Sequence, residues 1–191
     1  MGEAEASSVA AASRLDELFA NYERRVLGYA LRRTVTEADA QDAAVETFTI
    51  AWRKIDQVPT DALPWLLAVA RRVIANQRRG SQRRAWLVAK LGRQSISPQH
   101  VPAGEPEDGP ALAAMARLPA GDQELLRLMA WEELDHAAIA SVLGISVNAV
   151  AIRLHRARKR FRDELLKDAG PSRTPTEAKG TSTGAMREHV E

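Results

Sequence analysis

The strongest fold signal in the chain is the stretch at residues 135–161, with the sequence DHAAIASVLGISVNAVAIRLHRARKRF. It predicts two short helices joined by a tight turn. Asp135 and Ser146 can cap the two helices, because a side-chain oxygen accepts hydrogen bonds from the free N–H groups of a first turn. Gly144 suits the left-handed backbone position that ends a helix. The stretch is therefore typical of a helix-turn-helix.

The second of these helices has two contrasting faces at 3.6 residues per turn. The face that we expect to be buried consists of Val147, Val150, Leu154, Ala157, Phe161 and Leu165. The opposite face consists of Asn148, Ala149, Ile152, Arg153, His155, Arg156 and Lys159. Such a face suits a major groove, where Arg meets guanine edges or phosphates and methyl groups meet thymine. The alternative reading is a basic helix end that is merely solvated.

Composition favours a helical protein without a metal or cofactor. Hydrophobic residues make up 45% of the 191 residues, and only 5% are aromatic. The abundance of Ala, Leu and Arg favours helices over sheets. The chain has no cysteine, and its four histidines are scattered without ligand spacing, so we expect no metal site. The acidic N-terminus does not resemble a secretory signal and no apolar run is long enough to span a membrane, which predicts a cytoplasmic protein.

Charge is unevenly distributed along the chain, although the net charge is only +2. Residues 71–93 hold 8 basic and no acidic side chains, and residues 136–168 hold 7 basic and 3 acidic ones. Acid predominates in the segments before and between them, with 11 acidic against 7 basic side chains at residues 1–70. Two separated basic blocks predict two separate contacts with a polyanion.

Helical periodicity predicts three helices before residue 93. Residues 1–11 look disordered, a first helix runs from Ser13 to about Thr34, and a third begins near Asp61. The second helix, capped by Thr36, is expected to bury Ala44, Val45, Phe48, Ala51, Trp52 and Ile55. The third helix leads into the basic sequence RRVIANQRRGSQRR at residues 71–84, where Gly80 is a candidate interruption. The four tryptophans (Trp52, Trp65, Trp86 and Trp131) are expected in cores or at a domain interface.

A linker divides the chain. Residues 94–110 read QSISPQHVPAGEPEDGP, with no helical period. Helices are expected to resume at about Ala111, with a turn at Leu118–Pro119, and the polar tail after Asp168 is expected to be disordered. The predicted fold is all-α, with helical domains at residues 13–93 and 111–168, a flexible linker at 94–110 and a disordered tail at 169–191.

These motifs, in this order, resemble the extracytoplasmic-function (ECF) class of bacterial RNA polymerase sigma factors. In the first domain the resemblance rests on DAAVETF at residues 42–48, Ala51-Trp52, PWL at 64–66 and ARR at 70–72. In the second domain it rests on Leu118-Pro119, LGIS at 143–146 and RLHRAR at 153–158. The family usually has Gln at the position of Val45.

The resemblance implies a function and its residues. The first domain would be sigma region 2-like, and the second sigma region 4-like. Asp39, Asp42 and Glu46, spaced to share one helix face, would bind core RNA polymerase. The promoter-melting residues would be Arg71, Arg72, Asn76, Arg78, Arg79, Arg83 and Arg84. The upstream promoter element would be read by Asn148, Ala149, Ile152, Arg153, His155, Arg156 and Lys159.

The partners implied are core RNA polymerase and promoter DNA, and an anti-sigma factor, a common partner in this family. No small-molecule substrate, cofactor or catalysis is implied. The runner-up hypothesis is a stand-alone helix-turn-helix transcriptional regulator, in which the basic block at residues 71–93 would have no role. An RNA-binding or RNA-modifying protein is a third hypothesis, which lacks support from a catalytic constellation or an aromatic strand platform.

Overall fold

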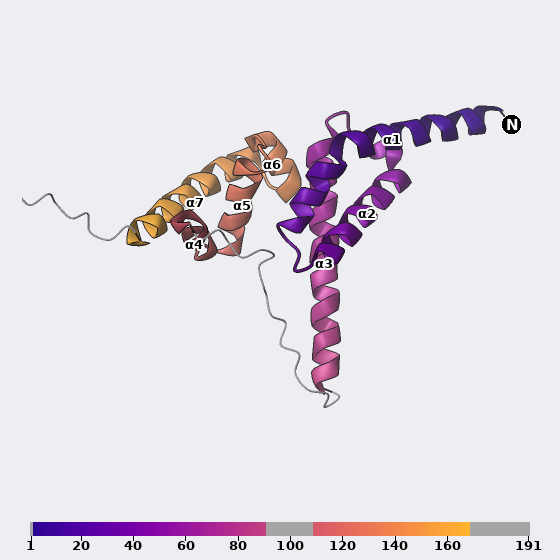
Figure 1. Cartoon of the computed structure of the whole chain (residues 1–191). Coiled ribbons are helices and arrows are strands. Elements are labelled where there is room, and N and C mark those ends of the chain that lie inside the picture. The colour runs from indigo at the N-terminus through magenta and orange to yellow at the C-terminus, as the bar shows by residue number, and fades with distance from the viewer. Residues whose placement is uncertain (1, 91–108, 169–191) are drawn as a thin grey trace, which may run out of the picture.

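The computed structural model describes residues 2–90 and 109–168, and within these ranges it contains helices and no strands (Figure 1). The first domain consists of α1 (Gly2–Leu31), α2 (Glu37–Arg53), the short 3-10 helix η1 (Ile55–Gln57) and α3 (Ala62–Lys90). The second domain consists of α4 (Pro110–Ala116), α5 (Ala120–Ala130), α6 (His136–Leu143) and α7 (Val147–Asp168). The predicted all-α fold is confirmed. The predicted tail and all but the last two residues of the predicted linker lie outside the described residues.

In the first domain α1, α2 and α3 pack against one another around an apolar core. Thr36 caps α2 as predicted, since its Oγ1 accepts a hydrogen bond from the Asp39 N–H at 3.0 Å. The buried stripe of α2 consists of Ala40, Ala43, Ala44, Thr47, Phe48 and Ala51. The prediction that Val45 and Trp52 are buried is wrong, because each lies roughly 100° or more around the helix from the centre of this stripe.

The expectation of disorder at residues 1–11 is also wrong, because α1 begins at Gly2. The segment is rich in Ala and contains Glu, both strong helix formers, and no residue in it breaks a helix. Val9 in this part of α1 is 66% exposed, and the helix extends away from the body of the molecule (Figure 1). Helix propensity accounts for this extension.

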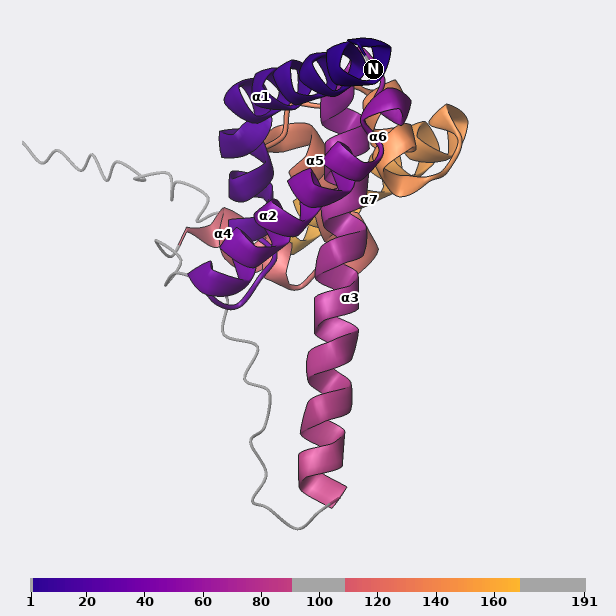
Figure 2. The same cartoon turned by 90° about the vertical axis from the view of Figure 1, so that its right-hand side faces the viewer.

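The third helix is long and uninterrupted. It begins at Ala62, with Pro64 in its first turn, and continues through Gly80 to Lys90. The proposed break at Gly80 is wrong, because glycine costs a helix only about 1 kcal/mol relative to alanine and leaves the hydrogen bonding intact. Beyond Ile74 none of the described side chains of α3 is buried, and this part projects from the body as an arm (Figure 2).

In the second domain α4, α5 and α6 all pack on α7. Leu118 and Pro119 form the predicted turn between α4 and α5, and the Asp122 N–H bonds to the Pro119 carbonyl at 2.9 Å. The core of this domain includes Leu125, Leu128 and Ile139.

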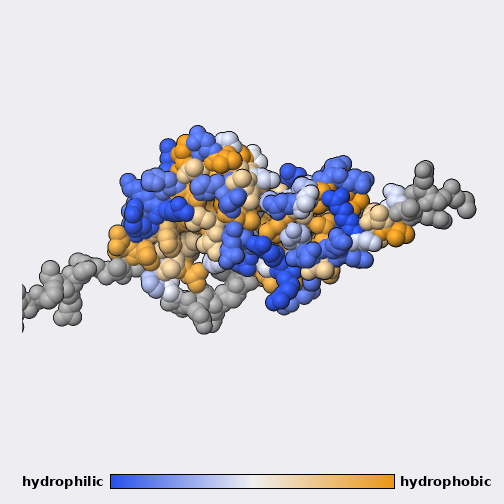
Figure 3. All heavy atoms as spheres, turned by 90° about the horizontal axis from the view of Figure 1, so that it is seen from above, coloured by the Kyte–Doolittle hydropathy of each residue, from blue (hydrophilic) through white to orange (hydrophobic). Residues whose placement is uncertain are grey.

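The two domains pack directly against each other through α3 and α6. The buried residues of both domains form one continuous apolar cluster, from Leu18 in α1 to Ala157 in α7. On the face of the molecule seen in Figure 3, hydrophilic and hydrophobic side chains lie interspersed over both domains. In the described ranges no single helix is both long and apolar enough to cross a membrane; α6 and α7 reach that limit only when joined, and they are bent by 100° at their break.

Candidate nucleic-acid interface

The helix-turn-helix of the second domain is built by the predicted caps. Asp135 Oδ1 accepts a hydrogen bond from the Ala138 N–H at 2.7 Å, and Ser146 Oγ accepts one from the Ala149 N–H at 3.2 Å. Gly144 adopts φ 67° and ψ 39°, and its N–H bonds to the Ala140 carbonyl. This left-handed residue turns the chain through the 100° bend that sets α7 across α6.

The faces of α7 follow the prediction with one correction. Val150, Leu154 and Ala157 are buried, and Phe161 packs against the same core. The predicted burial of Val147 is wrong, because this first residue of the helix is 48% exposed and has only part of a turn around it. On the opposite side, Ala149 is half-buried and the exposed residues are Asn148, Ile152, Arg153, His155, Arg156 and Lys159.

The basic face of α3 is also exposed. The predicted melting residues Arg71, Arg72, Asn76, Arg78, Arg79, Arg83 and Arg84 all have exposed side chains. Three of them are engaged inside the first domain, because Arg78 donates to the Arg33 carbonyl at 3.3 Å and Arg79 donates to Asn76 Oδ1. The remaining arginines of the arm have no ion pair within the described residues, so their charge is available to phosphates.

An aromatic side chain on this arm was missed by the sequence analysis. Trp86 is 61% exposed, and Lys90 Nζ lies 4.9 Å from its ring centroid. The expectation that the four tryptophans lie in cores or interfaces is wrong for Trp86, and Trp52 and Trp131 are also more than 40% exposed. The helical phase could have revealed Trp86, since it follows Arg79 by seven residues and Arg83 by three, and so shares their face.

The acidic face of α2 is exposed and separate from both basic faces. Asp39, Asp42 and Glu46 all lie on the solvent side of the helix. Asp39 Oδ2 accepts a hydrogen bond from the Thr36 hydroxyl at 2.7 Å, whereas neither Asp42 nor Glu46 has an ion pair in the described residues. Val45, 67% exposed, lies beside Asp42 on this face. Carboxylates around an apolar side chain suit a basic protein partner.

One residue of the basic face of α3 comes close to the basic face of α7, at a crevice that is otherwise lined by the second domain. Its volume is about 340 Å³, and Arg71 of α3 lines it together with Arg153, Arg156 and Arg160 of α7. Arg160 forms an ion pair with Asp122, which also lines the crevice. The structure thus brings one predicted melting residue next to two predicted recognition residues, while the rest of the α3 arm extends away from α7 (Figure 1).

No group of three or more His, Cys, Asp or Glu side chains within residues 2–90 and 109–168 is arranged to hold a metal ion. A helix-turn-helix with a basic outer face, together with a second basic helix, defines a helical nucleic-acid-binding protein of two domains.

Two family models match the chain: Sigma-70 region 2 at residues 18–84, and Sigma-70, region 4 at residues 109–161. The ECF RNA polymerase sigma factor SigL of Mycobacterium tuberculosis is 30% identical over 169 residues, which cover 85% of this chain and 94% of SigL. The chain belongs to the sigma-70 family of RNA polymerase sigma factors and to its ECF class. The probable RNA polymerase sigma factor RfaY of Xanthomonas campestris is 33% identical over 168 residues, 83% of this chain and 41% of RfaY.

Two solved structures share the fold. The sigma factor RpoE of Bartonella quintana, crystallised with the anti-sigma factor NepR, superposes with a TM-score of 0.59 at 20% identity, over 80% of this chain and 96% of that one. CnrH, in complex with the cytosolic domain of CnrY, superposes with a TM-score of 0.56 at 23% identity, over 85% of this chain and 97% of that one. At these identities the likeness extends to the fold alone.

Proposed function

We propose that the protein binds core RNA polymerase and directs it to specific promoters for transcription initiation. The observation that carries the proposal is the presence of three separate exposed faces, two basic and one acidic, on a chain of the sigma-70 family. Each face has a role: α2 docks on polymerase, α7 reads the upstream promoter element, and the α3 arm holds the melted strand.

The division of labour follows from the chemistry of each face. On α7, Arg153 and Arg156 supply donors for base edges or phosphates, and Ile152, 46% exposed, supplies an apolar surface for a thymine methyl. On α3 the run of arginines follows a phosphate backbone without sequence preference. Each module alone binds weakly in salt, and polymerase strengthens both by tethering them together.

The protein's own contribution is binding and strand separation, so we assign it no catalytic activity. The family relatives are sigma factors, and Asp39, Asp42 and Glu46 are better explained as a docking face than as a general acid–base pair. We place the protein in the cytoplasm, where polymerase and promoters are. The similarity to ECF sigma factors extends the proposed partners to an anti-sigma factor. A stand-alone regulator would need a symmetric dimer instead.

The first prediction tests the docking face. The double variant Asp42→Lys with Glu46→Lys should abolish co-elution with core polymerase in gel filtration. Helical content should be nearly unchanged, since exposed substitutions usually cost within about 0.5 kcal/mol. The matched control is Asp16→Lys with Asp56→Lys, which changes the net charge equally at two exposed acidic positions on other elements. Wild-type affinity in the Asp42/Glu46 variant would show that α2 is not the docking face.

A further inference from the structure

The crevice beside the first turn of α5 concentrates positive charge. Its volume is about 340 Å³, and four arginines line it: Arg71 of α3 and Arg153, Arg156 and Arg160 of α7. The three on α7 follow one another by three and four residues, so they share one face of that helix. Four guanidinium groups from two helices therefore border a space whose size suits a small ligand.

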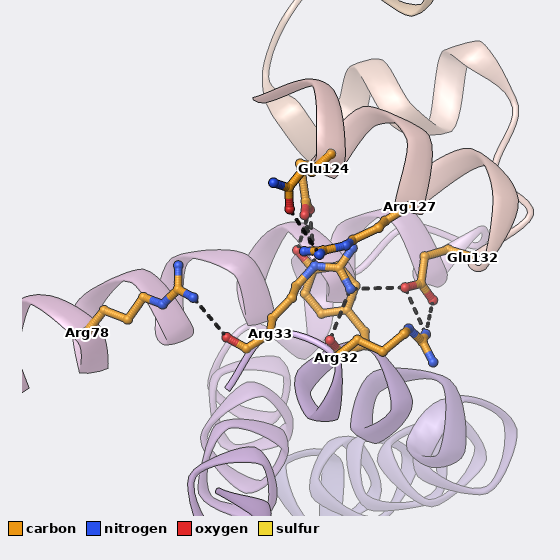
Figure 4. Close-up of polar contacts among 8 residues, drawn as sticks. Arg32, Arg33, Arg78, Glu124, Arg127 and Glu132 are labelled. Carbon is orange, nitrogen blue, oxygen red and sulfur yellow. Dashed lines mark hydrogen bonds and ion pairs between the residues drawn. The ribbon is translucent and has the colours of Figure 1, made fainter. Parts of the chain in front are cut away.

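Two carboxylates also line the crevice, but each already has a partner. Asp122 forms an ion pair with Arg160. Glu124 Oε2 lies 3.0 Å from Arg33 Nε, and Glu124 Oε1 accepts a hydrogen bond from the Tyr29 hydroxyl at 3.0 Å. Figure 4 shows Glu124 facing Arg33 of the first domain. Both acids are thus balanced by Arg33 and Arg160, and the charge of the other arginines in the crevice is not cancelled.

Three arginines of the crevice have no acidic partner. Arg71, Arg153 and Arg156 take part in no ion pair in the part of the chain that the structure describes. All three are exposed, so water solvates their charges in the free protein. Like charges that border one space repel one another, and an anion between them turns that repulsion into attraction. The crevice therefore offers three positive charges to an anion that enters it.

The rest of the lining suits a compact anion with an apolar part. Leu125, Leu143 and Ile145 supply the apolar surface. No side chain caps α5, which follows Pro119, and the free N–H groups of a helix start attract anions. Gly121 in that first turn lines the crevice, and a β-carbon added to it would meet no atom within 4 Å. Open space therefore lies beside the arginines.

Charge and shape together identify the class of ligand. The planar guanidinium group pairs with two phosphate oxygens at once. One phosphate group carries only about 1.5–2 negative charges near neutral pH, so three arginines are better matched by two linked phosphates. A duplex presents its phosphates on a convex surface, whereas the crevice is concave and partly apolar. This combination favours a ligand small enough to enter the crevice.

We propose that the crevice binds a small anion with two linked phosphate groups, either free pyrophosphate or a nucleoside diphosphate. Arg71, Arg153 and Arg156 hold the phosphates, and Leu143 and Ile145 contact the base of a nucleotide. The site goes beyond the proposed function, because binding of this ligand requires neither polymerase nor promoter DNA.

Isothermal titration calorimetry of the full-length protein in phosphate-free buffer tests the site. Pyrophosphate and ADP should each bind at one site per chain. Orthophosphate should bind at least about tenfold more weakly, because it forms fewer charged hydrogen bonds. Tighter binding of ADP than of pyrophosphate identifies a nucleotide site, and the reverse order identifies a pyrophosphate site. Absence of saturable binding by both diphosphates, or binding at several equal sites, would overturn the proposal.

Arginine variants test the location of the ligand. Arg71→Ala and Arg153→Ala should each weaken binding of the tighter diphosphate about tenfold or more. The matched controls are Arg72→Ala on α3 and Arg162→Ala on α7, which remove the same charge from exposed positions outside the crevice. Both controls should keep the affinity of the unaltered protein. Equal losses in the crevice variants and the controls would indicate general attraction of anions and contradict a defined site.

Gly121 provides a variant that adds charge without removing an arginine. Gly121→Glu should abolish binding, because its carboxylate occupies the open space beside the arginines. Helical content should not change, since an acidic residue is favourable in the first turn of a helix. Gly121→Ala is the control and should bind normally. Retained binding in Gly121→Glu would place the ligand elsewhere. Failure of the proposed function would appear separately, as failure of the unaltered protein to bind core polymerase.

Discussion

Arg153 and Arg156 lie one turn apart on α7, and their position separates recognition from stability. Both are exposed, whereas Leu154 between them is 1% exposed and sits in the core. We expect Arg153→Ala or Arg156→Ala to weaken promoter binding by the holoenzyme by about 1–3 kcal/mol if the contact is to a base edge. A phosphate contact would instead lower the salt slope by about one.

Footprinting of the upstream promoter element over a salt series measures the promoter affinity and the salt slope of the arginine variants. Binding to core polymerase is the control and should not change. Leu154→Ala should behave differently and unfold the second domain, because deleting a buried leucine costs about 2–5 kcal/mol. Normal transcription by both arginine variants would mean that the groove-facing side of α7 is misassigned.

The second prediction at the scale of the residue is that Trp86 stacks on a base of the melted strand. Its exposed ring follows the arginines of the α3 arm, as a base-stacking surface on a basic strand-binding helix would. We expect Trp86→Ala to reduce promoter opening by about 1–3 kcal/mol, the usual contribution of one stacked base. The fluorescence of 2-aminopurine in the melted segment measures opening.

Two variants make this prediction specific. Trp86→Phe should keep most of the effect, because it keeps a π face. Leu87→Ala, at an apolar neighbour that is also exposed, should have little effect. An equal loss of promoter opening in Trp86→Ala and Leu87→Ala would indicate a general apolar contact and not stacking on a base.

At the scale of the element, the sequence was most informative where a local signal acts alone. The caps at Thr36, Asp135 and Ser146 and the left-handed Gly144 each depend on neighbours within a few residues, and all four have the expected geometry. The errors at Val45 and Trp52 came from assigning large apolar side chains to the core. The actual stripe of α2 is made mostly of alanines, which allow α2 to approach its neighbours closely.

The candidate site was harder to predict than the helices. The exposed faces of α2, α3 and α7 could be read from periodicity, but the crevice that joins Arg71 to Arg153 could not. Arg32 and Arg33 form hydrogen bonds with Glu132, about a hundred residues further along the chain, and no sequence pattern predicts such a contact. Domain packing depends on surface shape and charge in three dimensions, which a single sequence does not display.

Two glycines provide a matched pair at this scale. A β-carbon added to Gly80 or to Gly144 would meet no other atom within 4 Å, so only backbone conformation decides the effect of a side chain. Gly80 lies inside α3, and Gly80→Ala should stabilise the protein by about 0.5–1 kcal/mol. Gly144 has φ 67°, and Gly144→Ala should destabilise the protein by about 1–2 kcal/mol.

Urea unfolding followed by circular dichroism measures both changes. Opposite signs are the expected result. Equal and negligible effects would mean that the turn of the helix-turn-helix relaxes when its left-handed residue is replaced, and that its geometry is less constrained than the caps indicate.

At the scale of the whole molecule, the expected flexible linker predicts two independent domains, whereas the observed contact packs the two domains together. A tether that only joined two independent domains would leave them apart, whereas one apolar cluster runs through both. The two domains therefore pack as one body. At the contact two carboxylates, Glu124 and Glu132, also pair with Arg32 and Arg33.

Limited proteolysis of the free protein tests both the predicted linker and the domain contact in one experiment. Residues 94–110 hold four Pro and two Gly without a helical period, so a protease should cut there first. The two fragments of the nicked protein should still elute together in gel filtration at low salt, held by the ion pairs of Arg32 and Arg33 with Glu132 and by α3 against α6. Nicked Glu132→Gln should separate into two peaks, because Arg32 and Arg33 both lose a charged partner and Glu124 pairs with Arg33 alone, whereas nicked Glu133→Gln should not. First cleavage inside a helix would refute the domain boundaries, and separation of the unaltered fragments would mean that the contact needs the intact chain.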